Sequence, residues 1–187
     1  MNNPETAEFL YSLESTDVTL KPPSNPPLHL PSQTWMIDEK LSERSQMMTQ
    51  QEVTEGLGLP FAAAKFLCHR KENPSKKAFM RIYFQIPIIS TLYQSPQIRR
   101  TQAAAKPQPH VESTTLKALN ELECDVVPDL LAYQEGMQDE DSIVPGGYIT
   151  YMVWDKVPGE PLDNDEFWEL DLKARQAIRD KFREAFP

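Results

Sequence analysis

The chain has 187 residues, with 17 prolines, 6 glycines and 2 cysteines. The cysteines, Cys68 and Cys124, are too few for a disulfide scaffold and form no paired zinc motif. No stretch approaches the ~18 apolar residues that a membrane span needs, and the N-terminus has no secretory signal pattern. We therefore expect a soluble, cytoplasmic protein without a membrane partner.

The net charge of −9 is unevenly distributed along the chain. Residues 1–60 carry a net −6, residues 61–120 a net +8, and residues 121–187 a net −11. The basic middle indicates either an anionic ligand or docking against the chain's own acidic segments. Nucleic acid is not an expected partner, because the basic block has one arginine pair, Arg99-Arg100, and no recognised reader motif.

The first 51 residues divide into a proline-rich segment and a segment of helical composition. Five prolines fall between positions 22 and 31, among Ser, Asn and Gln, which predicts that residues 1–34 form a disordered tail. Residues 35–51 have a helical composition and are predicted as a helix.

The predicted sheet begins at Glu52. Residues 52–58 and 62–69 form two short strands in this prediction, around the turn Gly56-Leu57-Gly58. Residues 78–86, AFMRIYFQI, are the clearest strand in the chain. Alternation along this strand places Arg81 on the face opposite the aliphatic side chains, so the guanidinium group needs a partner.

A helix is predicted over residues 110–123, after a Pro/Ala/Gln-rich connection at 87–109. Glu112 lies at the edge of its leucine-bearing face, which should dock on the sheet. Glu112 is therefore the candidate partner of Arg81. Two interpretations stay open: a structural ion pair that ties the helix to the sheet, or part of a ligand site.

The remaining pattern continues the sheet and ends in a helix. Residues 129–134 and 148–157 read as strands, the second antiparallel to the strand at 78–86, and residues 171–186 are amphipathic at helical spacing. An antiparallel sheet with one helix inserted after the third strand is an α+β arrangement.

Three phrases in this order resemble a known family. They are AFMRIYFQIP at 78–87, VPDLLAY at 127–133, and the segment from VPGGYITYMVW at 144 to VPGEPL ending at 162. They are similar to the small lobe of fungal protein-kinase-like proteins related to aminoglycoside and choline phosphotransferases. The resemblance implies a sheet of about five antiparallel strands plus one helix over residues 52–157. Residues 158–187 would then be the hinge exit and the first helices of a truncated large lobe.

The resemblance also implies a nucleotide site. Gly56 and Gly58 would cover the nucleotide phosphates, where glycine permits a close backbone approach. Arg81 would stand at the position of the phosphate-contacting lysine, and Glu112 would be the helix glutamate that pairs with it.

The backbone of the hinge, including Asp155 and Val157, would pair with adenine. ATP is thus the implied ligand. Its binding should be weak, because Phe79 stands where the family places a small residue over the base.

Catalysis is not expected from this chain, because it has no His-x-Asp loop and no later Asp-x-Gly, and so no magnesium site either. The leading interpretation is a truncated kinase-like protein that binds nucleotide weakly. The alternative is a non-enzymatic interaction module on a kinase-like scaffold. In either case Trp168, Ile178 and Phe182 are expected to meet a protein partner or a second copy.

Overall fold

The computed structural model describes residues 8–11, 13–21, 30–159 and 162–185. These residues form two compact units, one ending at Lys156 and the other beginning at Val157. Within the described ranges, no helix combines the length and the apolar character that crossing a membrane requires.

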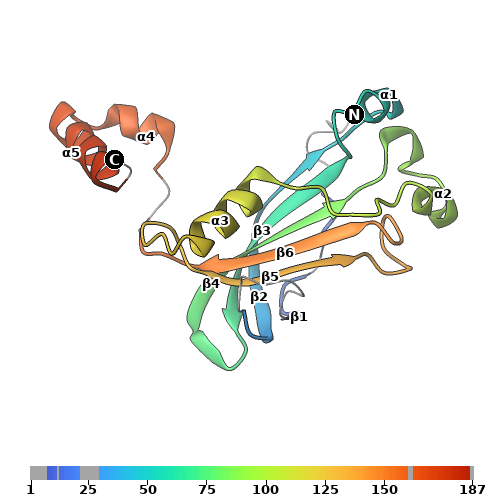
Figure 1. The fold of residues 1–187 in the computed structure, drawn as a ribbon, viewed down its shortest axis with the longest axis horizontal. Coiled ribbons are helices and arrows are strands. Elements are labelled where there is room, and N and C mark those ends of the chain that lie inside the picture. Colours follow the sequence, from blue (N-terminus) through green and yellow to red (C-terminus); the bar gives the residue numbers. More distant parts are fainter. Residues whose placement is uncertain (1–7, 12, 22–29, 160–161, 186–187) are drawn as a thin grey trace. The chain divides into compact units, whose positions relative to one another are not determined.

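The first unit is built on one antiparallel sheet of six strands (Figure 1). Its spatial order is β1-β2-β3-β4-β6-β5, and every neighbouring pair is antiparallel. The strands are β1 Asp17–Leu20, β2 Gln33–Gln46, β3 Phe61–Arg70, β4 Asn73–Gln85, β5 Leu130–Met137 and β6 Tyr148–Asp155.

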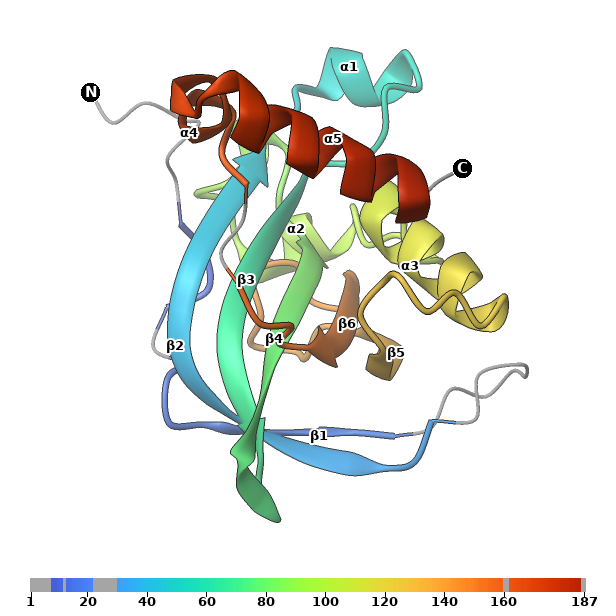
Figure 2. The ribbon, with the colours of Figure 1, turned by 90° about the vertical axis from the view of Figure 1, so that its left-hand side faces the viewer.

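The sheet curls until its two edges nearly meet, which makes it barrel-like. Strands β2, β3 and β4 are long and strongly bent (Figure 2). Edge strands β1 and β5 lie in contact. The Gln33 side chain donates to the Leu131 carbonyl over 3.3 Å, and the Lys21 amide donates to the Gln134 side chain over 2.6 Å. These bonds satisfy some of the polar groups that an open edge would expose.

Helices are few in the first unit and make up most of the second. The first unit has α1 Gln50–Thr54, a 3₁₀ turn η2 at Ile89–Thr91, α2 Pro96–Arg100 and α3 Val111–Glu121, which connects β4 to β5. The second unit contains α4 Asn164–Glu169 and α5 Leu172–Ala185.

The expected kinase-like small lobe, followed by the start of a helical large lobe, is wrong. The structure is a six-stranded, nearly closed antiparallel sheet with few helices. Two of its strands come from segments predicted otherwise, since β1 lies in the expected tail and β2 replaces the helix expected at 35–51. The remaining part of the expected tail, residues 1–7, 12 and 22–29, lies outside the described residues.

The error at β2 has a physical cause. Residues 38–46 favour a helix by composition, but Gln33, Trp35 and Ile37 alternate with less buried neighbours and face the interior. Pairing with β1 and β3 on both sides then outweighs local helix propensity.

The strand predicted at Glu52–Gly58 is also wrong, because this segment holds α1 and a turn. The Thr49 side chain accepts from the Glu52 amide, and the Glu52 side chain accepts from the Thr49 amide, which is a complete capping box. The remaining predicted elements are confirmed at β3, β4, α3, β5, β6 and α5. Most of their ends shift by one or two residues, but β4 begins at Asn73, well before the predicted residue 78, and β5 extends to Met137.

Alternation along the strands separates an apolar inside from a polar and aromatic outside. Ala78, Met80, Ile82 and Phe84 of β4 enter the core, together with Ala62, Ala64, Phe66 and Cys68 of β3. Arg81 therefore lies on the outer face, as predicted. Since the core side chains are all nearly unexposed, ligands have to be sought outside.

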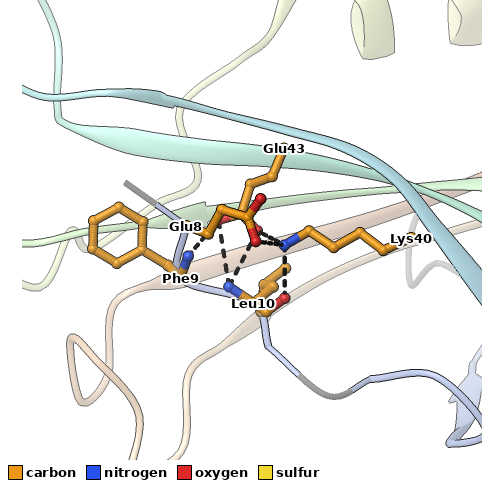
Figure 3. A network of polar contacts seen from close by, with 5 residues as sticks. All are labelled: Glu8, Phe9, Leu10, Lys40 and Glu43. Atoms are coloured by element: carbon orange, nitrogen blue, oxygen red, sulfur yellow. Dashed lines mark hydrogen bonds and ion pairs between the residues drawn. The ribbon is translucent and has the colours of Figure 1, made fainter. Parts of the chain in front are cut away.

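The N-terminal segment covers part of this core. Phe9, Leu10 and Leu13 pack against it, and the Phe9 ring meets the Phe84 ring edge-on at 6.4 Å. The carboxylate of Glu43 holds the segment in place (Figure 3). It accepts the Phe9 amide at 2.6 Å and the Leu10 amide at 3.3 Å.

Lys40 completes this network. Its ammonium lies 2.5 Å from the Glu43 carboxylate, whose side chain is fully buried, and 2.8 Å from that of Glu8. Burial alone lowers the pKa of Lys40, but the hydrogen bonds and charges of Glu43 and Glu8 outweigh burial and raise it. Lys40 thus stays charged beside the buried carboxylate, which compensates for the desolvation of the ammonium.

We predict that Glu43→Ala lowers the free energy of unfolding by about 3 kcal/mol, because it leaves the Lys40 ammonium without its buried partner. Urea unfolding measures the loss, and hydrogen exchange at the Phe9 and Leu10 amides should accelerate. The control is Glu39→Ala on the same strand, where the side chain is exposed and the change should stay within about 0.5 kcal/mol. Equal effects of the two variants would contradict this role of Glu43.

Candidate functional site

Cations and aromatic rings gather on the outer face of β3, β4 and β6. Lys65 pairs in register with Arg81, and Phe79 pairs with Trp154. Residues directly opposite each other in adjacent strands share a face of the sheet. The register therefore places two cationic side chains beside a pair of aromatic rings, which lie 6.0 Å apart between centroids.

The predicted pairing of Arg81 with Glu112 is confirmed. Arg81 Nε lies 3.1 Å from Glu112 Oε2, and its Nη2 donates to Oε1 over 3.2 Å. The Tyr83 hydroxyl donates to Oε2 over 2.5 Å. Both carboxylate oxygens are thus used, and the first turn of α3 is tied to β4. Burial, followed by the Glu112 hydrogen bond and charge, raises the pKa of Tyr83.

Lys65 has no comparable partner. Its ammonium lies over the Phe79 ring, 4.0 Å from the centroid, and 5.9 Å from the Trp154 centroid. In the part of the chain that the structure describes, no carboxylate approaches it within 4.0 Å. Burial and then the charge of Arg81 lower the pKa of Lys65, while Glu112 opposes this shift. Lys65 is therefore a half-buried cation on this face whose charge no carboxylate of the described residues neutralises in a direct ion pair.

An aromatic stack surrounds Tyr83, the second residue of β4 that is bonded to Glu112. The His110 ring is parallel to the Tyr83 ring, 4.0 Å away, and the Phe61 ring lies 4.5 Å from His110. His110 is the residue just before α3, so the stack fixes where the helix starts. Burial lowers the pKa of His110 to about 4, although Glu112 raises it slightly. The ring is therefore neutral at pH 7.

The two predicted loop glycines lie elsewhere in the first unit, and of the two Gly58 has a close neighbour. Gly56 ends the α1 turn with φ +81° and faces open space. Gly58 has φ +111°, and a Cβ there would lie 3.3 Å from the Gln108 amide group. Gln108 also accepts the Leu59 amide over 2.8 Å. This close approach of Gln108, together with the positive φ, is a reason for glycine at position 58.

The two hinge residues fall on either side of the unit boundary. Asp155 ends β6, and its amide donates to the Asp129 carbonyl over 3.1 Å, so this amide is already used. Its carboxylate lies 3.6 Å from the Lys76 ammonium. Val157 is about half exposed and begins the second unit. The structure thus brings together Arg81 and Glu112 out of the six predicted site residues.

Lys65 is the functional candidate that the sequence reasoning missed. The sequence feature that could have revealed it is a lysine in the middle of the otherwise apolar run FAAAKFLC at 61–68. Its neighbour across the strand pair, Arg81, depends on the register and is not readable from local pattern. Among the described residues, no group of three or more His, Cys, Asp or Glu side chains is arranged to hold a metal ion.

Comparisons with protein-family models, with curated proteins and with solved structures find no match to this chain. The site must therefore be interpreted from its own geometry.

The buried His110 predicts a pH dependence of stability. The unfolded chain has an ordinary histidine pKa of about 6.5, so between pH 6.5 and 4 it binds more protons at this site than the folded chain. The contribution of His110 is fully present above pH 6.5 and is lost as the pH falls towards 4. The loss should reach about 2 kcal/mol at pH 4.5.

Urea unfolding of the wild type and of His110→Phe, each at pH 7 and pH 4.5, measures this contribution. The carboxylates titrate in both proteins, so the difference between the two isolates the histidine. We expect the variant to lose less stability on acidification. The same loss in both proteins would exclude His110 as its source.

Proposed function

We propose that the outer face of β3, β4 and β6 binds a phosphorylated nucleotide of the ATP type with low affinity. The observation that carries the proposal is Lys65. Its half-buried ammonium lies beside Arg81 and has an aromatic ring, in place of a carboxylate, as its neighbour. Glu112 neutralises Arg81, so the charge of Lys65 is left without a negative partner. A phosphate group supplies this negative charge.

The aromatic pair Phe79 and Trp154 offers a stacking surface for the base of the nucleotide. Phe79 and Trp154 are each partly exposed and lie next to the two cations. Nucleobases stack on aromatic side chains with little dependence on sequence, while lysine and arginine contact the phosphates. Lys156 also lies over the Phe79 ring, 5.9 Å from its centroid, which adds a third cation at the same place.

Low affinity follows from the contacts already made. Arg81 is held by Glu112 and has to share its guanidinium group with a phosphate. Lys65 has to exchange its contact with the Phe79 ring for the ligand. A negative charge at Glu112 near the phosphates opposes a highly charged ligand.

We predict that ATP stabilises the chain and that Lys65→Gln weakens its binding about tenfold, because a charge-assisted hydrogen bond is lost. ATP at 100 times its dissociation constant adds about 2.7 kcal/mol, which raises the unfolding midpoint by roughly 5–11 °C. Calorimetric titration of ATP, tripolyphosphate and adenosine then separates the phosphate contribution from that of the base.

The control is Lys181→Gln in α5, an exposed lysine of the second unit, which should bind ATP like the wild type. Both ATP and tripolyphosphate should bind more tightly than adenosine, and ATP the most tightly of the three. No calorimetric signal with millimolar ATP, or equal weakening by the two lysine variants, would rule out the proposed site.

A second candidate function is protein association through the second unit. Trp168 is 57% exposed and Leu172 74% exposed, and Ile178 is partly buried on α5. Exposed apolar side chains of this size favour contact with a partner or a second copy. Arg175 lies over the Trp168 ring, 5.2 Å from its centroid, and covers part of it.

We expect the chain to self-associate at high concentration and Trp168→Gln to weaken the association, because it removes the largest of these apolar surfaces. Sedimentation velocity across a hundredfold range of concentration measures it. Lys173→Gln, on the same unit, serves as the control for a change of surface charge. A monomer at all concentrations would exclude self-association.

A further inference from the structure

A second candidate site lies on α3 and the strands next to it. A pocket of about 400 Å³ opens between the Pro107–Pro109 segment, α3 and the strands β5 and β6. Lys65, Phe79 and Arg81 are not among the residues that line it. Its volume is within the range of pockets that hold small organic ligands.

Thr150 gives this pocket an unused hydrogen-bonding group. The residue is 2% exposed and lines the pocket, and its hydroxyl has no hydrogen-bond partner among the described residues. Buried polar groups are rarely left unpaired, since an unpaired one lowers stability. A ligand with a hydroxyl group would supply the missing partner.

A lysine side chain, Lys117, lines the same pocket. The Lys117 ammonium lies 4.0 Å from the Tyr133 ring centroid, and no carboxylate of the described ranges comes within 4.0 Å of it. The Tyr133 hydroxyl is already engaged, since it donates to Glu135 over 2.5 Å. The first turn of α3, one turn before Lys117, has no side-chain cap, and the positive end of a helix dipole favours an anion there.

The charges that line the pocket favour a ligand with a single negative charge. Lys117 is the cation that lines the pocket, whereas Glu121 and Glu135 also line it. A second negative charge on the ligand would approach these carboxylates. Pro107 and Pro109 provide an apolar wall, which suits the carbon skeleton of the ligand.

We propose that this pocket binds a hydroxylated monocarboxylate of the size of a sugar acid. Its carboxylate pairs with Lys117 in the middle of α3, and one hydroxyl group hydrogen-bonds with Thr150. The proposal is independent of nucleotide binding at Lys65, because the two sets of residues do not overlap.

Titration with sodium glucuronate, followed by amide chemical shifts, tests the ligand class. Glucose keeps the hydroxyl groups without the carboxylate, and hexanoate keeps the carboxylate without the hydroxyl groups. We expect saturable binding of glucuronate, with both matched compounds at least tenfold weaker. No saturation by glucuronate, or equal binding of either matched compound, would overturn the proposal.

Thr150→Val tests the residue, because valine has nearly the same shape and lacks the hydroxyl. Glucuronate binding should weaken about tenfold, while the unfolding midpoint should be unchanged or higher, since an unpaired buried group is removed. Lys117→Gln should weaken binding by at least the same factor. The control Lys106→Gln changes an exposed lysine next to the pocket and should bind like the wild type.

Lys65→Gln separates the two proposals, since it should weaken ATP binding and leave glucuronate binding unchanged. Wild-type affinity in Thr150→Val would show that the hydroxyl does not contact the ligand, and the pocket assignment would then be wrong.

Discussion

The carboxylate of Glu112 determines where α3 lies on the outer face of the sheet. It accepts hydrogen bonds from Arg81 and Tyr83 of β4 and so fixes the first turn of α3 on that strand. His110, stacked on Tyr83, holds the helix start from the other side. With α3 in this position, Lys65 and Phe79 stay partly exposed, and the pocket of Lys117 and Thr150 forms against β5 and β6. Both proposed sites therefore depend on one anchored helix.

In the part of the chain that the structure describes, the inside of the sheet is filled with core side chains and leaves no place for a ligand site. Trp35, Phe66 and Met80 are fully buried among the side chains of a nearly closed sheet. The segment containing Phe9 and Leu10 covers part of this core and is held by the buried carboxylate of Glu43 (Figure 3). Because protein interiors are close-packed, the inner side chains serve stability, and both proposed sites lie on the outer face.

The basic side chains of residues 61–120 have two kinds of neighbour, carboxylates and aromatic rings. Part of the basic block docks against the chain's own acidic residues, since Lys71 pairs with Asp17, Lys77 with Asp38 and Arg100 with Glu140. Lys65 and Lys117 differ, because each lies over an aromatic ring at 4.0 Å. Intramolecular balance thus accounts for the first group. The second group belongs to the two sites where we propose that an anion binds.

The pairing of Arg81 with Glu112 was determined by the sequence alone. The alternation in AFMRIYFQI places Arg81 opposite the core face, and helical spacing places Glu112 at the edge of the docking face, so their pairing was predictable from two local patterns. The local capping box at Thr49 and Glu52 was readable as well, although the segment was predicted as a strand.

Tertiary structure decided the rest, because the deciding contacts join residues distant in sequence. Residues 35–46 become a strand through pairing with β1 and β3 against their helical composition. Lys65 reaches Arg81 only through the register of β3 with β4, and Thr150 reaches the pocket only after α3 docks. Local sequence sets which face a side chain points to, while long-range pairing sets what it meets there.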